Sequence, residues 1–321
     1  MRRTAFILGA GFSAGAQFPL VRGLKELVIR SVEVERHPVY AALLRPGRGF
    51  VRGEFYDGLD RVDENSQRGF EELLIALRHT CANANDDDPR YTTLRVLRIG
   101  CARLLWRMQN AIGRIPASYQ NFAQRFFKPP EMRSNVVISF NWELLFERSL
   151  LEASIPWQYN VGSSGLTAVL KPHGSINWSS WMESGGRCDY EGWRPIAAGS
   201  KLCFDATQPL VDPDADEINP DYRYMLFPGD PELPEQNANL KLIWSDVQAA
   251  LEECEALVFI GYSLPEYDSY SAEMFRRYSA GRRVEVYNPS AEHLEHFRRQ
   301  FGDHVELFAQ KFEECQYAQA S

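Results

Sequence analysis

Apolar positions along the chain follow two periods, which separate predicted strands from predicted helices. Short runs rich in β-branched and aromatic residues predict buried strands. These runs cover residues 4–8, 135–140, 168–171, 256–260, 283–287 and 305–308. Apolar spacings of three and four predict helices over 21–33, 66–80, 91–112, 118–127, 144–153, 240–254, 269–278 and 291–301. Because strands alternate with helices, we expect an α/β fold built on a doubly wound parallel sheet.

The pattern changes between residues 31 and 130, where amphipathic helical stretches are separated by a glycine-rich loop and an acidic break. We interpret 31–130 as a mostly helical insertion. Residues 179–239 are rich in Gly, Pro, Asp and aromatic residues and predict a second, loop-rich insertion. The predicted α/β domain therefore comprises 1–30 plus 131–321.

The helical stretch carries large apolar side chains that a single sheet is not expected to cover completely. They are Trp106, Phe122, Phe126 and Phe127. Exposed apolar patches of this kind mark interaction surfaces. We therefore expect a homo-oligomer built through this block.

Composition narrows the class of protein. The chain has 321 residues, of which 45% are hydrophobic, and a formal net charge of −8. Nucleic-acid-binding domains are usually basic, so we expect no direct nucleic-acid binding. The longest apolar runs are too short to span a membrane, so we expect no membrane span. The apolar run after the basic N-terminus stops at Gly9, which argues against a signal peptide. We therefore expect a cytoplasmic location. Six widely spaced cysteines without a Cys-x-x-Cys pair predict free thiols and no zinc site.

The first predicted strand leads into three glycines, Gly9, Gly11 and Gly15. A strand, a glycine turn and a helix together form the arrangement that binds a pyrophosphate. We expect Gly9 to permit a tight turn, Gly11 to let a phosphate approach the backbone N–H groups, and the helix over 21–33 to provide the positive end of its dipole. The spacing differs from that of dinucleotide dehydrogenases, so a glycine turn without a ligand is an alternative.

Four other predicted strands also end in glycine or polar residues. These residues are Asn141 and Glu143, His173 and Gly174, Gly261 and Ser263, and Asn288. In open parallel sheets, ligands bind outside the carboxyl ends of the strands. Each residue alone is typical of a turn, but five such strand ends in one sheet predict a ligand site.

In the order of these motifs, the sequence resembles the sirtuin superfamily, and within it the sirtuin-like NAD-hydrolase domains of prokaryotic defence proteins. The motifs are Gly9-Ala-Gly11-Phe-Ser13, Phe70-Glu-Glu-Leu-Leu, Ser139-Phe-Asn141-Trp-Glu143, Lys171-Pro-His173-Gly174-Ser175, Ile260-Gly261-Tyr-Ser263-Leu264 and Val286-Tyr-Asn288-Pro289. The resemblance extends over most of the chain, from residue 4 to residue 308.

The resemblance implies a role for each motif and NAD as the substrate. Gly9, Ala10, Gly11 and Ser13 would hold the NAD pyrophosphate, and Gly261, Ser263 and Asn288 would line the adenosine ribose and phosphate. Asn141 would bind the nicotinamide ribose or a water, Glu143 would replace an aspartate that faces the carboxamide, and His173 would be the general base. The implied reaction is hydrolysis of NAD to ADP-ribose and nicotinamide in prokaryotic antiviral defence, under the control of assembly or of an activating or inhibiting protein partner.

The sequence departs from the deacylases of the superfamily. The stretch Gly15-Ala-Gln-Phe-Pro19 lacks their Asp-Phe pair, Trp142 and Glu143 stand where Tyr-Asp is usual, and their zinc ribbon is missing. We therefore expect an NAD glycohydrolase. Two alternatives stay open, namely a non-catalytic module that senses NAD or ADP-ribose, and an NAD-dependent protein deacylase or ADP-ribosyltransferase.

Overall fold

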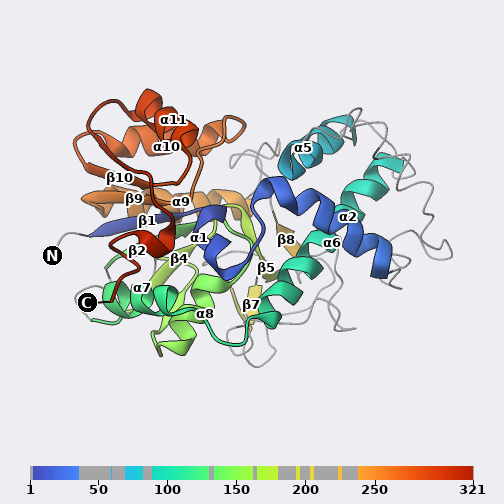
Figure 1. Ribbon diagram of the computed structural model, residues 1–321, viewed down its shortest axis with the longest axis horizontal. Helices are drawn as coiled ribbons and strands as arrows, with labels where there is room; N and C mark the ends of the chain where they lie inside the picture. Colours follow the sequence, from blue (N-terminus) through green and yellow to red (C-terminus); the bar gives the residue numbers. More distant parts are fainter. Residues whose placement is uncertain are drawn as a thin grey trace.

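The computed structural model describes residues 3–35, 59, 69–81, 89–129, 134–161, 165–179, 193–195, 203–205, 223–225 and 238–320. A parallel sheet with helices on both faces forms the centre of the molecule, and further helices lie beside it (Figure 1). The predicted fold class, a doubly wound α/β sheet, is confirmed. No helix in the described part of the chain combines the length and the apolar composition needed to cross a bilayer.

Seven parallel strands form the main sheet in the order β11-β10-β9-β1-β2-β4-β3. They are β1 (Thr4–Leu8), β2 (Val136–Ser139), β3 (Trp157–Gln158), β4 (Thr167–Leu170), β9 (Ala256–Ile260), β10 (Arg283–Tyr287) and β11 (Val305–Phe308). Without the short edge strand β3, this is the 3-2-1-4-5-6 order of dinucleotide-binding folds, which reverses between β1 and β9. Leu8 is in register with both Ser139 and Ile260, so three strands end at one level.

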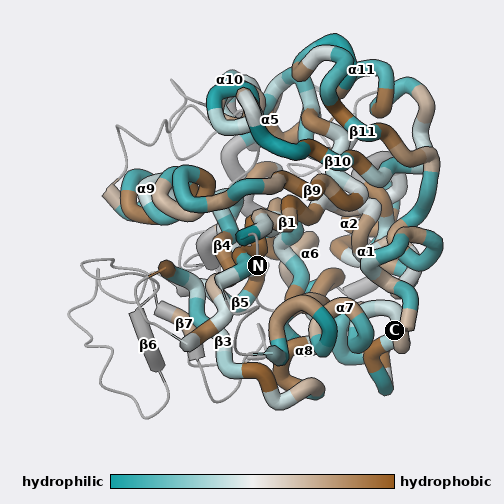
Figure 2. Tube along the Cα trace, turned by 90° about the vertical axis from the view of Figure 1, so that its left-hand side faces the viewer, coloured by the Kyte–Doolittle hydropathy of each residue, from teal (hydrophilic) through white to brown (hydrophobic). Residues whose placement is uncertain are grey.

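Alternate residues of β1 enter two separate cores. Phe6 and Leu8 face the core beneath α7 (Ala117–Phe127) and α8 (Leu145–Glu152). Ala5 and Ile7 face the core beneath α9 (Ala238–Glu253), α10 (Ser269–Ser279) and α11 (Ala291–Phe301). Burial on both faces explains why the strands are continuous apolar runs. Figure 2 shows the hydrophobic colour gathered along β1 and β9.

The aromatic residues of α7 are covered by the sheet. Phe122 and Phe127 are fully buried and contact the ring of Phe6 edge-on, at centroid distances of 5.0 and 5.7 Å. Trp106 and Phe126 are partly buried against the same core. The expected exposure is therefore wrong for Phe122 and Phe127, whereas Trp106 and Phe126 are covered only in part. The oligomeric state stays a prediction without that support.

Helices α5 (Phe70–Cys81) and α6 (Pro89–Ala111) of the predicted insertion pack on each other and on α2 (Val21–Glu35), most of which precedes residue 31 and belongs to the predicted α/β domain. Leu24, Leu73 and Leu97 nevertheless belong to the same buried cluster as residues of the sheet. The helical block thus shares a core with the α/β part, and α7, also within 31–130, covers the sheet itself. The division at 31–130 stays a prediction.

The chain does not pass from β1 straight into the predicted helix over 21–33. The helix that follows β1 is α1 (Ala10–Ser13), continued by the 3₁₀ turn η1 (Ala14–Ala16). Gln17 then adopts a left-handed conformation with φ of 66°, and α2 begins only at Val21. The expectation that the helix over 21–33 places its positive end at the glycine turn is therefore wrong.

A second, antiparallel sheet follows β4. It contains β5 (Gly174–Ser179), β6 (Trp193–Pro195), β7 (Cys203–Asp205) and β8 (Arg223–Met225) in the order β6-β7-β5-β8. Three of these strands lie within the predicted loop-rich insertion, which therefore contains more regular structure than expected. Each has three residues, too few to display an alternating pattern. The C-terminal segment after β11 includes the 3₁₀ turn η5 (Phe312–Glu314).

Candidate functional site

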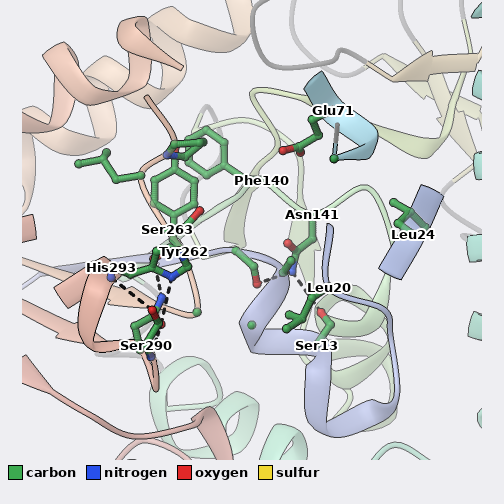
Figure 3. Close-up of a pocket in the computed structure, with 18 of the residues that line it drawn as sticks. Ser13, Leu20, Leu24, Glu71, Phe140, Asn141, Tyr262, Ser263, Ser290 and His293 are labelled. Atoms are coloured by element: carbon green, nitrogen blue, oxygen red, sulfur yellow. Dashed lines mark hydrogen bonds between the residues drawn. The ribbon is translucent and has the colours of Figure 1, made fainter. Parts of the chain in front are cut away.

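The ten residues that the sequence predicts as site residues line one pocket of about 1080 Å³ at the carboxyl edge of the main sheet. Figure 3 shows Ser13, Asn141 and Ser263 among the residues of this pocket. They are Gly9, Ala10, Gly11, Ser13, Asn141, Glu143, His173, Gly261, Ser263 and Asn288. They follow the ends of β1, β2, β4, β9 and β10. The pocket therefore crosses the point where the strand order reverses, which is where such sheets bind dinucleotides.

Two glycine turns meet at the floor of the pocket. The N–H of Gly11 donates to the carbonyl of Gly261 at 2.9 Å, and the N–H of Gly9 donates to that of Ile260 at 3.1 Å. A Cβ added to Gly11 would lie 2.7 Å from the Cα of Gly261, and one added to Gly261 would lie 2.2 Å from the backbone nitrogen of Phe12. Gly11 is therefore required by backbone contact between two strand ends. The N–H of Gly11 itself is engaged by Gly261, and the approach of a phosphate to the other backbone N–H groups of the turn stays a prediction.

Asn141 is oriented by a buried hydrogen-bond network. Its Nδ2 donates to the carbonyl of Gly9 at 3.0 Å and to Ser13 Oγ at 3.1 Å. Ser13 Oγ in turn donates to Glu143 Oε1. Because both contacts use the amide nitrogen, the amide oxygen of Asn141 is directed away from Ser13 (Figure 3). Asn141 can thus offer a fixed acceptor to a ligand hydroxyl or a water.

Glu143 lies in the pocket wall, with its carboxylate engaged inside the protein. Besides the bond from Ser13, its Oε2 accepts the N–H of Leu145 at 2.5 Å, at the start of α8. Burial has the largest effect on the carboxyl and raises the pKa of Glu143, against the lowering effect of the Lys171 charge. The neutral carboxyl is therefore favoured relative to an exposed glutamate. Contact with a carboxamide stays a prediction.

His173 occupies the turn between β4 and β5 and is held by its neighbours. Its Nε2 lies 3.1 Å from Asp268 Oδ2, and its ring packs edge-on against Phe140 at 4.7 Å. Its backbone carbonyl accepts the indole N–H of Trp142 at 3.0 Å. Gly174 has φ of 74°, so a glycine at this position permits the turn into β5. The imidazole thus has a defined orientation at the pocket wall.

Three residues near His173, namely Asp268, Glu71 and Tyr267, were not assigned roles from the sequence. Asp268 caps α10 by accepting the N–H of Ser271 at 3.3 Å, so in the sequence it resembles an ordinary capping residue. Glu71, at the start of α5, lines the pocket, and its carboxyl accepts a hydrogen bond from the hydroxyl of Tyr267. The sequence signal for Glu71 was its place in the Phe70-Glu-Glu-Leu-Leu motif. For Asp268 and Tyr267 no sequence signal pointed to the site.

The two carboxyl groups near His173 have opposite pKa shifts. Burial raises the pKa of Glu71 above its ordinary 4.5, although the Tyr267 hydrogen bond and the charge of His173 lower it. Burial also acts to raise the pKa of Asp268, but the charge and hydrogen bond of His173 and the hydrogen bonds from Ser271 outweigh it and lower the pKa below 3.8. Asp268 is therefore the carboxyl that stays ionised.

The other end of the pocket is organised by Asn288. Its Nδ2 donates to the carbonyl of Tyr262 at 3.1 Å, and its Oδ1 accepts the N–H of Ser290 at 3.0 Å. Ser290 then caps α11 by accepting the N–H of His293 at 3.3 Å. Ser263 is half-buried at the pocket wall. Asn288 thus shapes this wall through the turn that it closes.

Metal ligands are not gathered in the part of the chain that the structure describes: no group of three His, Cys, Asp or Glu side chains there is placed to hold an ion. Cys101, Cys254 and Cys315 are buried free thiols, as expected from their spacing. Cys188 lies outside the described residues. The expected lack of zinc stays a prediction.

No protein-family model matches the chain, and no curated protein matches it. Solved structures match it over nearly its whole length. Sir2Tm bound to a propionylated peptide is 11% identical, with 98% of this chain and 90% of that chain covered and a TM-score of 0.42. A complex of a Sir2 homologue variant with ADP-ribose is 13% identical, with 97% and 88% covered and a TM-score of 0.41. A structure on the basis of sirtuin substrate affinity is 12% identical, with 97% and 89% covered and a TM-score of 0.42.

Proposed function

We propose that the protein is an NAD glycohydrolase that cleaves NAD with water to ADP-ribose and nicotinamide. The observation that carries the proposal is the meeting of Asn141 and His173 in one pocket at the switch point of a 3-2-1-4-5-6 sheet. A pocket at this place suits a dinucleotide, since its two halves can extend over the strands on either side of β1.

The orientation of the ligand follows from the sequence resemblance. The pyrophosphate lies over Ala10 and the glycine turn, and the adenosine half extends past Ser263 toward Asn288. The nicotinamide ribose then lies beside Asn141 and His173. This placement puts the polar, buried end of the pocket at the bond to be broken.

Hydrolysis breaks the bond between ribose C1′ and the nicotinamide nitrogen, and the electron pair leaves with nicotinamide, which becomes neutral. Positive charge develops on the ribose, and a water oxygen forms the new bond to C1′. The amide oxygen of Asn141 orients a ribose hydroxyl or this water. His173 accepts the water proton as general base.

Incubation of the purified protein with NAD, followed by chromatography, tests the reaction. We expect nicotinamide and ADP-ribose in equal amounts with no acylated peptide present. Nicotinamide that appears only after addition of an acyl-lysine peptide would support the deacylase instead. Labelled ADP-ribose retained on protein would indicate ADP-ribosyl transfer.

A second candidate, a non-catalytic sensor of NAD or ADP-ribose, is favoured by one observation. Two predicted ligand contacts are engaged with neighbouring protein groups: Glu143 accepts the N–H of Leu145, and Asn288 donates to the carbonyl of Tyr262 and accepts the N–H of Ser290. A pocket shaped in this way can bind a nucleotide without reacting with it. Calorimetric binding of NAD with no product at any protein concentration, also after addition of cell extract as a source of an activating partner, would support the sensor.

The biological setting is proposed from the resemblance alone. Unchecked cleavage would exhaust the NAD of a cell, so we propose that the enzyme is controlled by homo-oligomer assembly or by an activating or inhibiting protein partner in prokaryotic antiviral defence. We also propose a cytoplasmic location, where NAD is available.

A further inference from the structure

We propose that Asp268 is the positioning residue of His173. It holds the imidazole in the tautomer with the proton on Nε2, which leaves Nδ1 as the atom that accepts a proton. The catalytic part of this inference rests on the proposed NAD hydrolysis. The tautomer itself depends only on the contact between the two side chains.

The donors around Asp268 define the contact. Its Oδ1 accepts the N–H of Ser271 at 3.3 Å, and its Oδ2 accepts the hydroxyl of Tyr262 at 3.2 Å. His173 Nε2 lies 3.1 Å from the same Oδ2. Asp268 and His173 are 6% and 7% exposed, so water does not compete freely for this contact. An ionised carboxylate can only accept hydrogen bonds, so the imidazole nitrogen that faces it must carry the proton.

Among the described residues, the other charged groups near the ring do not make the same contact with it. Glu71 and Glu72, at the start of α5, both line the pocket, and the carboxyl of Glu71 accepts a hydrogen bond from the hydroxyl of Tyr267. Glu71 acts on His173 through charge at a distance, whereas Asp268 makes a hydrogen bond. Phe140 covers the ring edge-on and contributes no proton donor or acceptor.

The contact gives a complete path for the proton in the proposed reaction. Before the reaction, neutral His173 carries its proton on Nε2, toward Asp268. As the water oxygen bonds to C1′, Nδ1 takes the water proton, and the imidazolium that forms stays paired with the carboxylate. The carboxylate does not itself become protonated. In catalytic triads, too, a histidine acts as the base while a buried carboxylate orients it.

Histidine side-chain ¹⁵N NMR of the ligand-free protein tests the tautomer without any need for activity. The chain contains six histidines, so the signal that disappears in His173→Gln identifies the one of interest. We expect neutral His173 to carry its proton on Nε2 in the wild type. In Asp268→Asn the amide NH₂ can donate to Nε2, so we expect a shift toward the Nδ1–H tautomer. A wild-type Nδ1–H tautomer, or an unchanged tautomer in Asp268→Asn, would overturn the proposal.

Two variants separate positioning from the helix cap. Asn and Ser both cap helices well, so Asp268→Asn and Asp268→Ser should keep the cap of α10. Asp268→Asn should also keep the melting temperature, whereas Asp268→Ser leaves the buried Tyr262 hydroxyl without this acceptor and should lower it. Serine is too short to reach the imidazole. We expect both to lower kcat by about 10²- to 10⁴-fold with KM changed by less than about threefold. Glu252→Gln, a carboxylate-to-amide change at a helix that does not line the pocket, is the matched control and should leave kcat and the tautomer unchanged.

The NMR tautomer and the release of nicotinamide together separate this inference from the proposed function. A wild type with the Nε2–H tautomer and no release of nicotinamide would support the His173–Asp268 contact and contradict NAD hydrolysis. Full turnover in a folded Asp268→Asn variant would contradict the positioning role, even if the wild type hydrolyses NAD.

Discussion

The two ends of the pocket are built in different ways. Around His173 and Asn141, buried side chains are held by other buried side chains, Asp268 and Ser13. Around Asn288 and Ser263, the wall is formed by turns, and the polar side chain of Asn288 closes its own turn and the start of α11. The first arrangement orients the two proposed catalytic side chains, and the second shapes a surface. We infer that chemistry and anchoring are separated along the pocket.

Removal of the reactive groups should have the largest effect. His173→Ala and Asn141→Ala should fold, bind NAD within about tenfold of the wild type, and lose turnover by about 10²- to 10⁴-fold. The reason is that each removes a group used in the transition state. Steady-state kinetics and calorimetry provide the measurements.

The matched change at the other end is Ser263→Ala. It should raise KM with kcat within about threefold of the wild type, because this end supplies binding rather than chemistry. If Ser263→Ala lowered kcat as much as His173→Ala does, the inferred separation of chemistry and anchoring would be wrong.

Substitution at the Gly11–Gly261 contact, between the two ends of the pocket, should lower the free energy of unfolding. Gly11→Ala places a Cβ 2.7 Å from the Cα of Gly261, so urea unfolding should show a loss of about 1–3 kcal/mol or more. The matched control is Gly23→Ala in α2, where a Cβ meets nothing within 4 Å. Helix propensity favours alanine there by up to about 1 kcal/mol. A Gly11→Ala protein as stable as the wild type would contradict the backbone contact.

Glu143→Gln should change how stability depends on pH. The folded protein raises the pKa of Glu143 above its ordinary 4.5, so the wild type loses stability from this group as pH rises above 4.5 through the folded value. Glutamine can accept from Leu145 and donate to Ser13 without a charge to bury. The stability of the variant relative to the wild type should therefore increase with pH, by about 1.4 kcal/mol for each pH unit between the unfolded and folded pKa values. Urea unfolding between acidic and neutral pH measures this, and a constant difference would contradict the shift.

The smallest effect is expected from metal removal. We expect well under one zinc per chain by elemental analysis, and a chelator should leave the melting temperature unchanged. This prediction applies to both ends of the pocket, since neither gathers a ligand set among the described residues. Stoichiometric zinc would require ligands from elsewhere in the chain.

The central strands and the site residues could be predicted from the sequence for the same physical reason. Strands buried on both faces are continuous apolar runs, and the carboxyl ends of parallel strands meet at one edge. The strand ends that carry Asn141 and His173 are therefore expected at the same edge from the sequence alone. Strand β3, with two residues, and β6, β7 and β8, with three each, carry too little pattern to be recognised.

Other features depend on which elements become neighbours in space. The role of Gly11 follows from the pairing of β1 with β9, which are far apart in the sequence. Asp268 was missed because a helix cap and a partner for His173 require the same residue type. Sequence spacing identifies the strand that presents a residue, whereas the contact partners depend on strand order and helix placement.

The contact between Gly11 and Gly261 also constrains how such a protein can evolve. The atoms that a new side chain would meet at either position belong to the backbone of the other turn. A second substitution therefore cannot compensate for the first, because no side chain is available to shrink. The contact between Gly11 and Gly261 is therefore closed to gradual change, while half-buried Ser263 and the exposed first turn of α11 can accept new residues one at a time. New ligand specificities in this scaffold would thus arise from the ends of the pocket inward.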